Sequence, residues 1–345
     1  MRLMVIGDFR WDSGSSHVIR EYARHAPAQG IEIAVSSTFG SRDEQICRDL
    51  PYIEDLKWAT HLLIVFEGNP FLKDDDLERI DRVVPKSRRA VVDADGHWGS
   101  IAQIGEDNNT WPCGHEGWQR QIAEVSDLVL QPALFEPCQG AVRFPYFGMP
   151  SCAPAPLFDE RGSHLDMQYI GCNWFRFRPL VEVFSACREA LGKGSSLRVR
   201  GRYWDGKMRL GFESGTKADI DLLKRLDIEV LPPVPFGQVV ERMGDALITP
   251  VLVRPVLAAC RLMTPRMLET VSAATIPVYR QADRYIGDLY QDDGELCLGH
   301  SPADKLKQIV QDQVRFRAKA HELRHRLYRE YSYSSVLGHL KRLLN

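Results

Sequence analysis

Short apolar runs alternate with amphipathic stretches along most of the chain. In the first half, apolar runs such as 3–6 and 61–66 predict buried strands, and apolar residues at helical spacing from about His17 predict a helix between them. Strands that alternate with helices in this way indicate βαβ units and a mostly parallel sheet. The elements predicted for this half are strands 3–6, 31–35, 61–66, 90–92, 128–131 and 141–144, and helices from about 17, 44–50, 74–83 and 119–125.

A second alternating series begins near residue 167. It follows a segment at 145–156 that is rich in Pro, Gly and Ser and is typical of a linker. The pattern therefore predicts an α/β protein with two Rossmann-like domains, 1–155 and 156–330, and 345 residues suffice for two cores. The elements predicted for this half are strands 168–170, 197–199, 228–231, 246–249, 276–279 and 295–298, and helices 179–191, 217–226, 236–243, from 265, 302–327 and 331–343.

Composition narrows the class of protein. A hydrophobic content of 44% and a charged content of 26% are ordinary for a soluble globular protein. The net charge of −2 gives no electrostatic case for nucleic acid or an anionic membrane as the main partner. No apolar run approaches 18 residues, so no membrane span is expected, and the eight cysteines include no Cys-x-x-Cys pair. The start does not resemble a signal peptide, so we expect a reduced, cytoplasmic protein, and its oligomeric state stays open.

The segment 262–279 carries the first candidate site. Thr264 is a good helix N-cap, and Pro265 suits the first helical position, where its missing N–H costs nothing. The start of such a helix presents free N–H groups and the positive end of a dipole, which together bind anions. Glu269 stands one turn further, where it can accept hydrogen bonds from hydroxyls attached to that anion. A phosphate beside a diol describes a nucleotide, and the alternative is a short amphipathic helix with one solvated Glu.

This Pro-Arg-x-x-Glu segment, with the small-residue run and Pro-Val strand after it, resembles the donor-binding helix of GT-B glycosyltransferases. The likeness is to retaining family 4 enzymes and to spore-maturation-type glycosyltransferases. It implies two Rossmann-like domains facing across a cleft, the first for the acceptor and the second for a sugar nucleotide, with the C-terminal helix, about 331–345, returning to the first domain. It also implies that Glu269 binds the ribose hydroxyls. Family 4 usually carries a second Glu eight positions earlier, where this sequence has Arg261.

The loop 8–16 lies at the carboxyl end of the first predicted strand, where parallel sheets bind their ligands. It lacks Gly-x-Gly-x-x-Gly, so a dinucleotide fingerprint is not supported. The resemblance implies instead that its small residues, Gly14 and Ser15 among them, pack against the donor diphosphate. His17 could take a proton from an acceptor hydroxyl near neutral pH, and the alternative is a histidine that caps or orients the loop.

The loop 93–99 follows another predicted strand and is expected on the acceptor side. Asp93 and His97 could bind acceptor hydroxyls, Asp95 could act as a base, and Trp98 could stack on a sugar. The alternative is a plain strand-end turn with a core tryptophan. Asp-x-Asp also suggests a metal-bound diphosphate, but the resemblance implies neutralisation by Arg, Lys and helix dipoles, so no metal is expected.

Cations follow the strands of the second half. Family 4 relatives place an Arg and a Lys after the first of these strands to grip the departing diphosphate, and Arg176 and Arg178 are the nearest candidates. The alternative for each cation is a solvated surface charge. The resemblance places the nucleotide base near Pro235. The donor-binding candidates are Gly14, Ser15, Asn173, Arg202, Pro235, Thr264, Pro265, Arg266, Met267, Leu268 and Glu269, with Arg254 and Arg266 as further phosphate candidates.

The sequence therefore predicts a glycosyltransferase that moves a sugar from a nucleotide-sugar to a hydroxyl on a small molecule or glycan. The nucleotide-sugar is a co-substrate, and no cofactor is expected. Uridine is assumed on frequency alone, and retention rests on the resemblance, whereas a His17 or Asp95 base would imply inversion. The alternatives are a sugar-nucleotide epimerase or hydrolase, and a non-catalytic nucleotide-sugar-binding protein in which Arg261 marks lost activity.

Overall fold

The computed structural model describes residues 1–7, 13–36, 50–65, 72, 74–98, 114–149 and 165–345. The chain divides into two compact units, each built around one parallel β-sheet. Residues 44–49 of the predicted helix 44–50, residues 8–12 of the loop 8–16 and residues 150–156 of the linker 145–156 lie outside the described residues. Unit 1 comprises Met1–Pro150, Ala259–Pro265 and Arg329–Asn345, and unit 2 comprises Ser151–Ala258 and Arg266–Tyr328.

The sheet of unit 1 has the order β2-β1-β3-β4-β5-β6, and all neighbouring strands are parallel. In β1, Leu3 and Val5 point to one face and Met4 and Ile6 to the other, and all four are fully buried. Burial on both faces is what a parallel sheet requires, and it explains the unbroken apolar runs in the sequence. The strands are β1 Arg2–Gly7, β2 Glu32–Val35, β3 His61–Val65, β4 Arg89–Val92, β5 Val129–Gln131 and β6 Ala141–Arg143.

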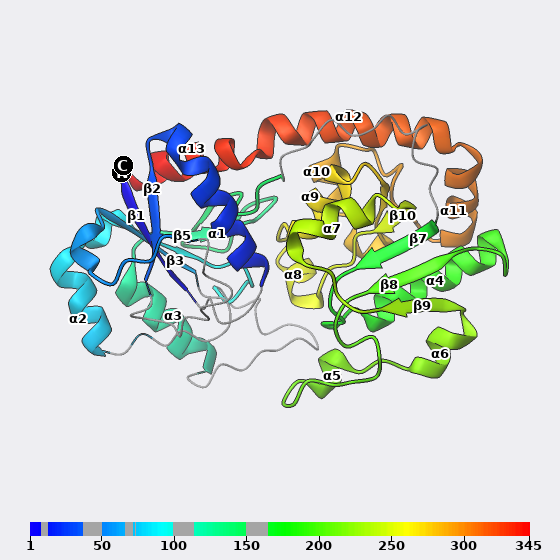
Figure 1. The fold of residues 1–345 in the computed structure, drawn as a ribbon, viewed down its shortest axis with the longest axis horizontal. Helices are drawn as coiled ribbons and strands as arrows, with labels where there is room; N and C mark the ends of the chain where they lie inside the picture. The colour runs from blue at the N-terminus through cyan, green and yellow to red at the C-terminus, as the bar shows by residue number, and fades with distance from the viewer. Residues whose placement is uncertain (8–12, 37–49, 66–71, 73, 99–113, 150–164) are drawn as a thin grey trace. The chain divides into compact units, whose positions relative to one another are not determined.

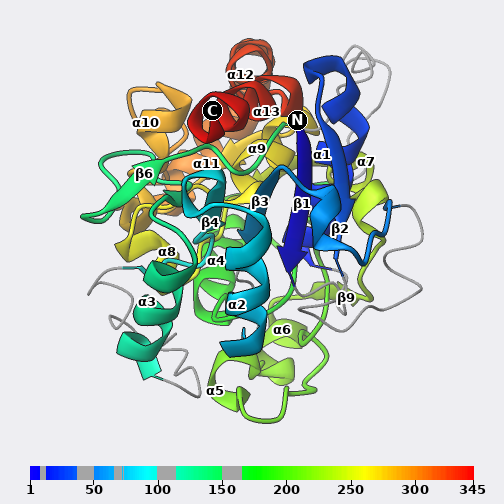
Figure 2. The same cartoon turned by 90° about the vertical axis from the view of Figure 1, so that its left-hand side faces the viewer.

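Helices cover both faces of this sheet (Figure 2). α2 (Asp74–Val83) and α3 (Gly114–Val125) cover the face that carries Met4 and Ile6, through Ile80 and Ile122. α1 (Gly14–His25) lies on the opposite face, because the β1–β2 and β3–β4 crossovers run in opposite directions across the sheet. α1 starts three residues before His17, since the Ser13 hydroxyl accepts the Ser16 N–H at 3.1 Å.

The C-terminal helix α13 (Tyr333–Leu344) returns to unit 1, as predicted, and packs against α1 (Figure 1). The Met149 N–H donates to the Tyr331 carbonyl at 2.7 Å as the chain arrives. Lys341 Nζ donates to the Gln29 carbonyl at 2.7 Å, and the Tyr333 ring packs edge-on against Tyr22. Buried rings and these hydrogen bonds therefore anchor a segment more than 300 residues from α1 in sequence.

The segment Ala259–Pro265, which the sequence assigns to the second half, belongs to unit 1. Leu262 pairs with Ala133 in an antiparallel bridge, and the Met263 N–H donates to the Pro132 carbonyl at 2.6 Å. Leu262 and Met263 are both buried. The apolar pair therefore anchors this excursion on the loop that follows β5.

Unit 2 has the parallel order β11-β10-β7-β8-β9 and is drawn from green to orange in Figure 1. Within the described part of the chain, no helix is long and apolar enough to cross a bilayer. The strands are β7 Leu165–Ile170, β8 Leu197–Arg200, β9 Ile228–Leu231, β10 Ala246–Pro250 and β11 Ile276–Val278. The helices are α4 Phe177–Leu191, α5 Glu213–Thr216, α6 Ile220–Arg225, α7 Phe236–Met243, α8 Pro255–Ala259, α9 Pro265–Ser272, α10 Ile286–Tyr290, α11 Pro302–Gln311 and α12 Gln313–Tyr331, which ends in unit 1.

Three of the elements predicted for unit 2 are formed differently, and α5, α8 and α10 were not predicted. The helix predicted at 217–226 begins only at Ile220, because the side chain of Asp219 caps α6 there by accepting the Leu222 N–H at 2.9 Å. The helix predicted at 302–327 is broken at Asp312 into α11 and α12. The strand predicted at 295–298 is not formed and leaves only a bridge between Tyr279 and Cys297. Its residues are held instead by a turn in which the buried Asp292 carboxylate accepts the Leu296 N–H at 2.8 Å.

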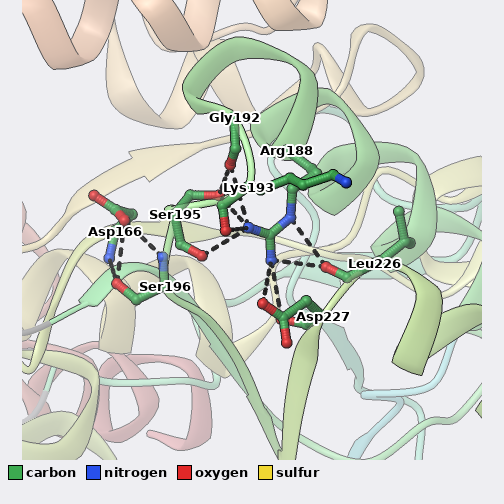
Figure 3. Close-up of polar contacts among 8 residues, drawn as sticks. All are labelled: Asp166, Arg188, Gly192, Lys193, Ser195, Ser196, Leu226 and Asp227. Atoms are coloured by element: carbon green, nitrogen blue, oxygen red, sulfur yellow. Dashed lines mark hydrogen bonds and ion pairs between the residues drawn. The ribbon is translucent and has the colours of Figure 1, made fainter.

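Arg188 closes the amino edge of the unit 2 sheet (Figure 3). It projects from the last turn of α4 between the chain segments that enter β8 and β9. Its guanidinium donates to the carbonyls of Lys193 and Ser195 at 2.9 Å and to those of Leu226 and Asp227 at 2.8 and 3.0 Å. One half-buried guanidinium thus donates hydrogen bonds to carbonyls at the ends of helices and in loops, which helix and sheet hydrogen bonds do not satisfy.

Candidate functional site

The helix α9 begins at Pro265, as predicted. The predicted side-chain cap is wrong, because the Thr264 hydroxyl finds no hydrogen-bond partner in the described part of the chain, although Thr264 is only 4% exposed. The Pro265 ring lies 3.7 Å from the position that a Cβ on Gly14 would occupy. Pro265, which belongs to unit 1, therefore lies beside Gly14 of the same unit, and the buried Thr264 hydroxyl precedes the N–H groups that the first turn of α9 leaves free.

Glu269 lies one turn into α9 and is 5% exposed. Its Oε2 is 2.9 Å from Arg266 Nη1, a distance that makes an ion pair. The two groups are not aligned for a hydrogen bond, and none of the described residues donates one to this oxygen. A buried carboxylate oxygen usually accepts hydrogen bonds, so Oε2 retains the capacity to accept one from a ligand.

Met267 and Leu268, which the sequence counts among the donor-binding residues, have fully buried side chains. The Met267 carbonyl accepts a hydrogen bond from the Tyr290 hydroxyl at 2.8 Å. These contacts fix the helix in the core of unit 2. The groups that these two residues could offer a ligand are their first-turn backbone N–H groups.

Asn173 follows β7 and is fully buried. Its Nδ2 donates to the carbonyls of Tyr203, Thr216 and Lys217 at 3.0–3.1 Å. Its Oδ1 finds no partner within the described ranges. The side chain therefore ties the loop after β7 to the loop after β8, and its oxygen is a second buried acceptor at the carboxyl edge of the sheet.

The cations predicted to hold a diphosphate differ in burial and in hydrogen bonding. Arg176 donates from Nε to the Leu252 carbonyl at 3.2 Å and from Nη1 to the Trp174 carbonyl at 3.4 Å, so much of its donor capacity serves the loops. Arg178 and Arg202 are exposed, and so is Pro235. Their predicted roles stay predictions.

A cluster that the sequence did not single out lies around Trp174, in the loop after β7. The Arg254 guanidinium, which follows β10, lies 5.8 Å from the centre of the Trp174 ring, and that of Arg209, which follows β8, lies 5.2 Å away. Phe212 packs against the same indole at 5.0 Å. Loops after three strands thus bring two positive charges to the carboxyl edge of unit 2, where cation–π contacts hold them.

In unit 1, the Asp93 carboxylate organises the turn after β4. It accepts the backbone N–H groups of His97 and Trp98, both at 2.8 Å, and the Gln131 Nε2 at 2.7 Å. Asp93 is fully buried and His97 is buried, while Trp98 Nε1 donates to the Gln139 carbonyl at 3.0 Å. This geometry favours the alternative of a strand-end turn for Asp93.

The two candidate bases, His17 and Asp95, are half-buried and both belong to unit 1. His17 is in the first turn of α1, where its N–H donates to the Ser13 carbonyl at 3.1 Å. Asp95 is in the turn that Asp93 organises. Ser15, in the first turn of α1, is buried. The roles predicted for these residues stay predictions.

Asp283 is a buried acid at the carboxyl end of β11, and it leads to a prediction about pH. Burial raises the pKa of Asp283 to about 6, although Arg280, 2.9 Å away, lowers it. Because this pKa is above the unfolded value of 3.8, the stability it contributes is present below about pH 4 and is lost as pH rises through 6. Asp283→Asn cannot ionise, so we expect its free energy of unfolding, relative to wild type, to rise by about 1–3 kcal/mol between pH 4 and 7.5.

Urea unfolding at pH 4, 6 and 7.5 would measure this change. Glu182→Gln is the matched control, because Glu182 is half-exposed and pairs with the same arginine at 3.1 Å. We expect that control to change the free energy of unfolding by less than about 1 kcal/mol at each pH. An Asp283→Asn difference that does not depend on pH would contradict the assignment.

A scan against models of known protein families finds no match, and a search of curated proteins finds none either. Solved structures do match, each over 100% of this chain. Anabaena Alr3699/HepE in complex with UDP matches over 99% of its chain with a TM-score of 0.67 and 9% identity. An alpha-glucosyltransferase in complex with UDP-glucose and DNA containing an abasic site matches over 99% of its chain, with a TM-score of 0.61 and 11% identity. T4 phage BGT in complex with UDP and Mn²⁺ matches over 100% of its chain, with a TM-score of 0.57 and 12% identity.

These likenesses show the fold, and the chain has the GT-B fold that the sequence predicted. They also correct one expectation. A metal-free site was predicted, but a protein of this fold, T4 phage BGT, holds Mn²⁺ together with UDP. The described residues do not gather three or more His, Cys, Asp or Glu side chains into a set that fits such an ion.

Proposed function

We propose that this protein transfers a sugar from a nucleotide-sugar donor, a UDP-sugar, to a hydroxyl acceptor. The observation that carries the proposal is the start of α9, where the Thr264 hydroxyl and Glu269 Oε2 are buried without hydrogen bonds from other described residues. Free helix N–H groups suit a diphosphate, and a carboxylate oxygen that lacks a donor suits a ribose hydroxyl. The likeness to structures that contain UDP or UDP-glucose supports the same ligand.

In this proposal, unit 2 holds the donor. The first-turn N–H groups of α9 and the Arg254 guanidinium hold the diphosphate, and Glu269 accepts from the ribose. Negative charge grows on the diphosphate as its bond to the anomeric carbon breaks and the acceptor oxygen bonds to that carbon, so these donors act most strongly in the transition state. The resemblance to family 4 and spore-maturation-type enzymes favours retention, with the acceptor proton passing to the departing phosphate oxygen. His17 or Asp95 as the base would give inversion.

Unit 1 is assigned the acceptor. A small molecule or glycan is the first candidate, because the net charge of −2 offers no general attraction to nucleic acid. DNA enters as a second candidate, because the alpha-glucosyltransferase of the same fold was solved with DNA.

A thermal-shift screen against UDP-, GDP-, dTDP- and ADP-sugars tests the proposal. A ligand at a hundred times its Kd stabilises the folded state by about 2.7 kcal/mol, which raises Tm by roughly 4–10 °C. We expect UDP and at least one UDP-sugar to give such a shift and that sugar nucleotide to release UDP slowly in water. A shift with no UDP released on adding acceptors would favour the non-catalytic binder. A changed sugar still attached to UDP would indicate an epimerase, and no shift with any nucleotide would refute the proposal.

A further inference from the structure

Arg266 is next to Glu269 on the same face of α9. The Nη1–Oε2 distance is 2.9 Å, and the side chains are 16% and 7% exposed. Because the pair is separated by three positions in a helix, no loop has to move to form it. The guanidinium of Arg266 therefore forms an ion pair with the Glu269 carboxylate. The sequence had suggested that this guanidinium contacts a phosphate.

Other contacts hold the Arg266 guanidinium in place. It lies 5.8 Å from the centre of the Tyr169 ring, which is buried in β7, and its Nη1 is 3.7 Å from the Met243 sulfur at the end of α7. An aromatic ring and a sulfur restrict the rotamers of a long side chain before any ligand arrives. The arginine thus presents a fixed positive charge to Glu269.

The pairing has two consequences for a ligand at α9. The fixed guanidinium holds Oε2 in one orientation without using up its capacity to accept a hydrogen bond, because the pair is not aligned as a hydrogen bond. It also cancels the negative charge of Glu269, which would otherwise repel a diphosphate bound at the same helix start. A lysine could supply the charge but not the planar group that packs on Tyr169.

We propose that Arg266 is a positioning residue that orients Glu269 toward the ribose hydroxyls and does not itself hold a phosphate. This inference rests on the proposed function, since it assigns a role within the same site. It makes a specific claim about selectivity. Arg266 controls how strongly the site distinguishes a nucleotide with ribose hydroxyls from one without them.

The test compares UDP with 2′,3′-dideoxy-UDP by calorimetry in wild type, Glu269→Gln, Arg266→Met and Arg266→Lys. Arg225→Met, on the exposed end of α6, controls for loss of a positive charge. We expect wild type and the control to prefer UDP by about ten- to a hundredfold. Glu269→Gln and Arg266→Met should each bring this preference to within about threefold of unity, and Arg266→Lys should keep part of it. The double variant should lose no more than either single variant.

Other outcomes separate the rival roles. If Arg266→Met weakens both nucleotides by the same factor and keeps the preference, Arg266 is a phosphate ligand and the inference is wrong. If it lowers Tm and leaves both affinities and the preference unchanged, its role is structural and the inference is equally wrong. If wild type binds neither nucleotide, the proposed function fails and takes this inference with it. If wild type binds both equally, the ribose assignment fails while nucleotide binding stands.

Discussion

Glu269→Ala is expected to weaken the binding of UDP by about ten- to a hundredfold. The variant removes a buried acceptor, and hydrogen bonds to a charged group are worth about 1.5–3 kcal/mol each. It also leaves the Arg266 guanidinium without its carboxylate partner at 2.9 Å. Titration calorimetry of wild type and variant with UDP measures the change, and a fall in donor turnover at subsaturating UDP-sugar should accompany it.

Glu189→Ala is the matched control for this experiment, because Glu189 is an exposed carboxylate on α4 of the same unit. We expect UDP affinity and Tm to stay unchanged in the control. Glu269→Gln keeps the shape of the side chain and should lose most of the affinity, since an amide oxygen is a weaker acceptor than a carboxylate. Undiminished affinity for UDP in both Glu269 variants would remove Glu269 from the ribose site.

Arg188→Met is expected to lower the free energy of unfolding by about 3–5 kcal/mol. The guanidinium donates to the carbonyls of Lys193, Ser195, Leu226 and Asp227, and methionine would leave these acceptors at a partly buried edge without donors (Figure 3). Methionine preserves most of the apolar volume of the stem, so the loss reports the hydrogen bonds. Urea unfolding, followed by circular dichroism, measures it.

Arg198→Met is the control for this variant. Arg198 makes an ion pair with Glu229, which is half-exposed, at 2.6 Å, and such pairs contribute less than about 1 kcal/mol. The free energy of unfolding of Arg188→Lys should lie between those of Arg188→Met and Arg198→Met, because a lysine keeps the charge but cannot reach all the carbonyls at once. Equal stability of Arg188→Met and wild type would show that water replaces the guanidinium without cost.

The sequence predicted most strands because their signal is local. Runs such as Leu3-Met4-Val5-Ile6 are apolar throughout, which is what a strand buried on both faces of a parallel sheet needs. The prediction from sequence failed where hydrogen bonds to a polar side chain determine the backbone conformation. Three apolar residues in the run 295–298 suggest a short strand, but hydrogen bonds from the backbone to the Asp292 carboxylate turn the chain there. Asp219 likewise starts a helix inside a stretch whose periodicity predicted one continuous helix.

The candidate site divides in the same way. Pro265 and Glu269 could be found because both belong to one short helix, and helix geometry fixes their spacing. The cluster of Trp174, Arg209 and Arg254 could not, because three loops far apart in sequence bring it together. The docking of Leu262 on Ala133 also depends on a long-range contact. Periodicity contains no information about such pairings.

The excursion of Ala259–Pro265 and the return of α13 have a consequence during protein synthesis. Unit 1 takes its first strands and helices from Met1–Pro150, but Arg329–Asn345 completes it. The α13 contact surface on α1, including the ring of Tyr22, therefore stays uncovered until residues 329–345 have emerged from the ribosome. We expect unit 1 to stay incompletely packed while unit 2 is translated, and to complete its packing only when α13 has been synthesised and binds α1.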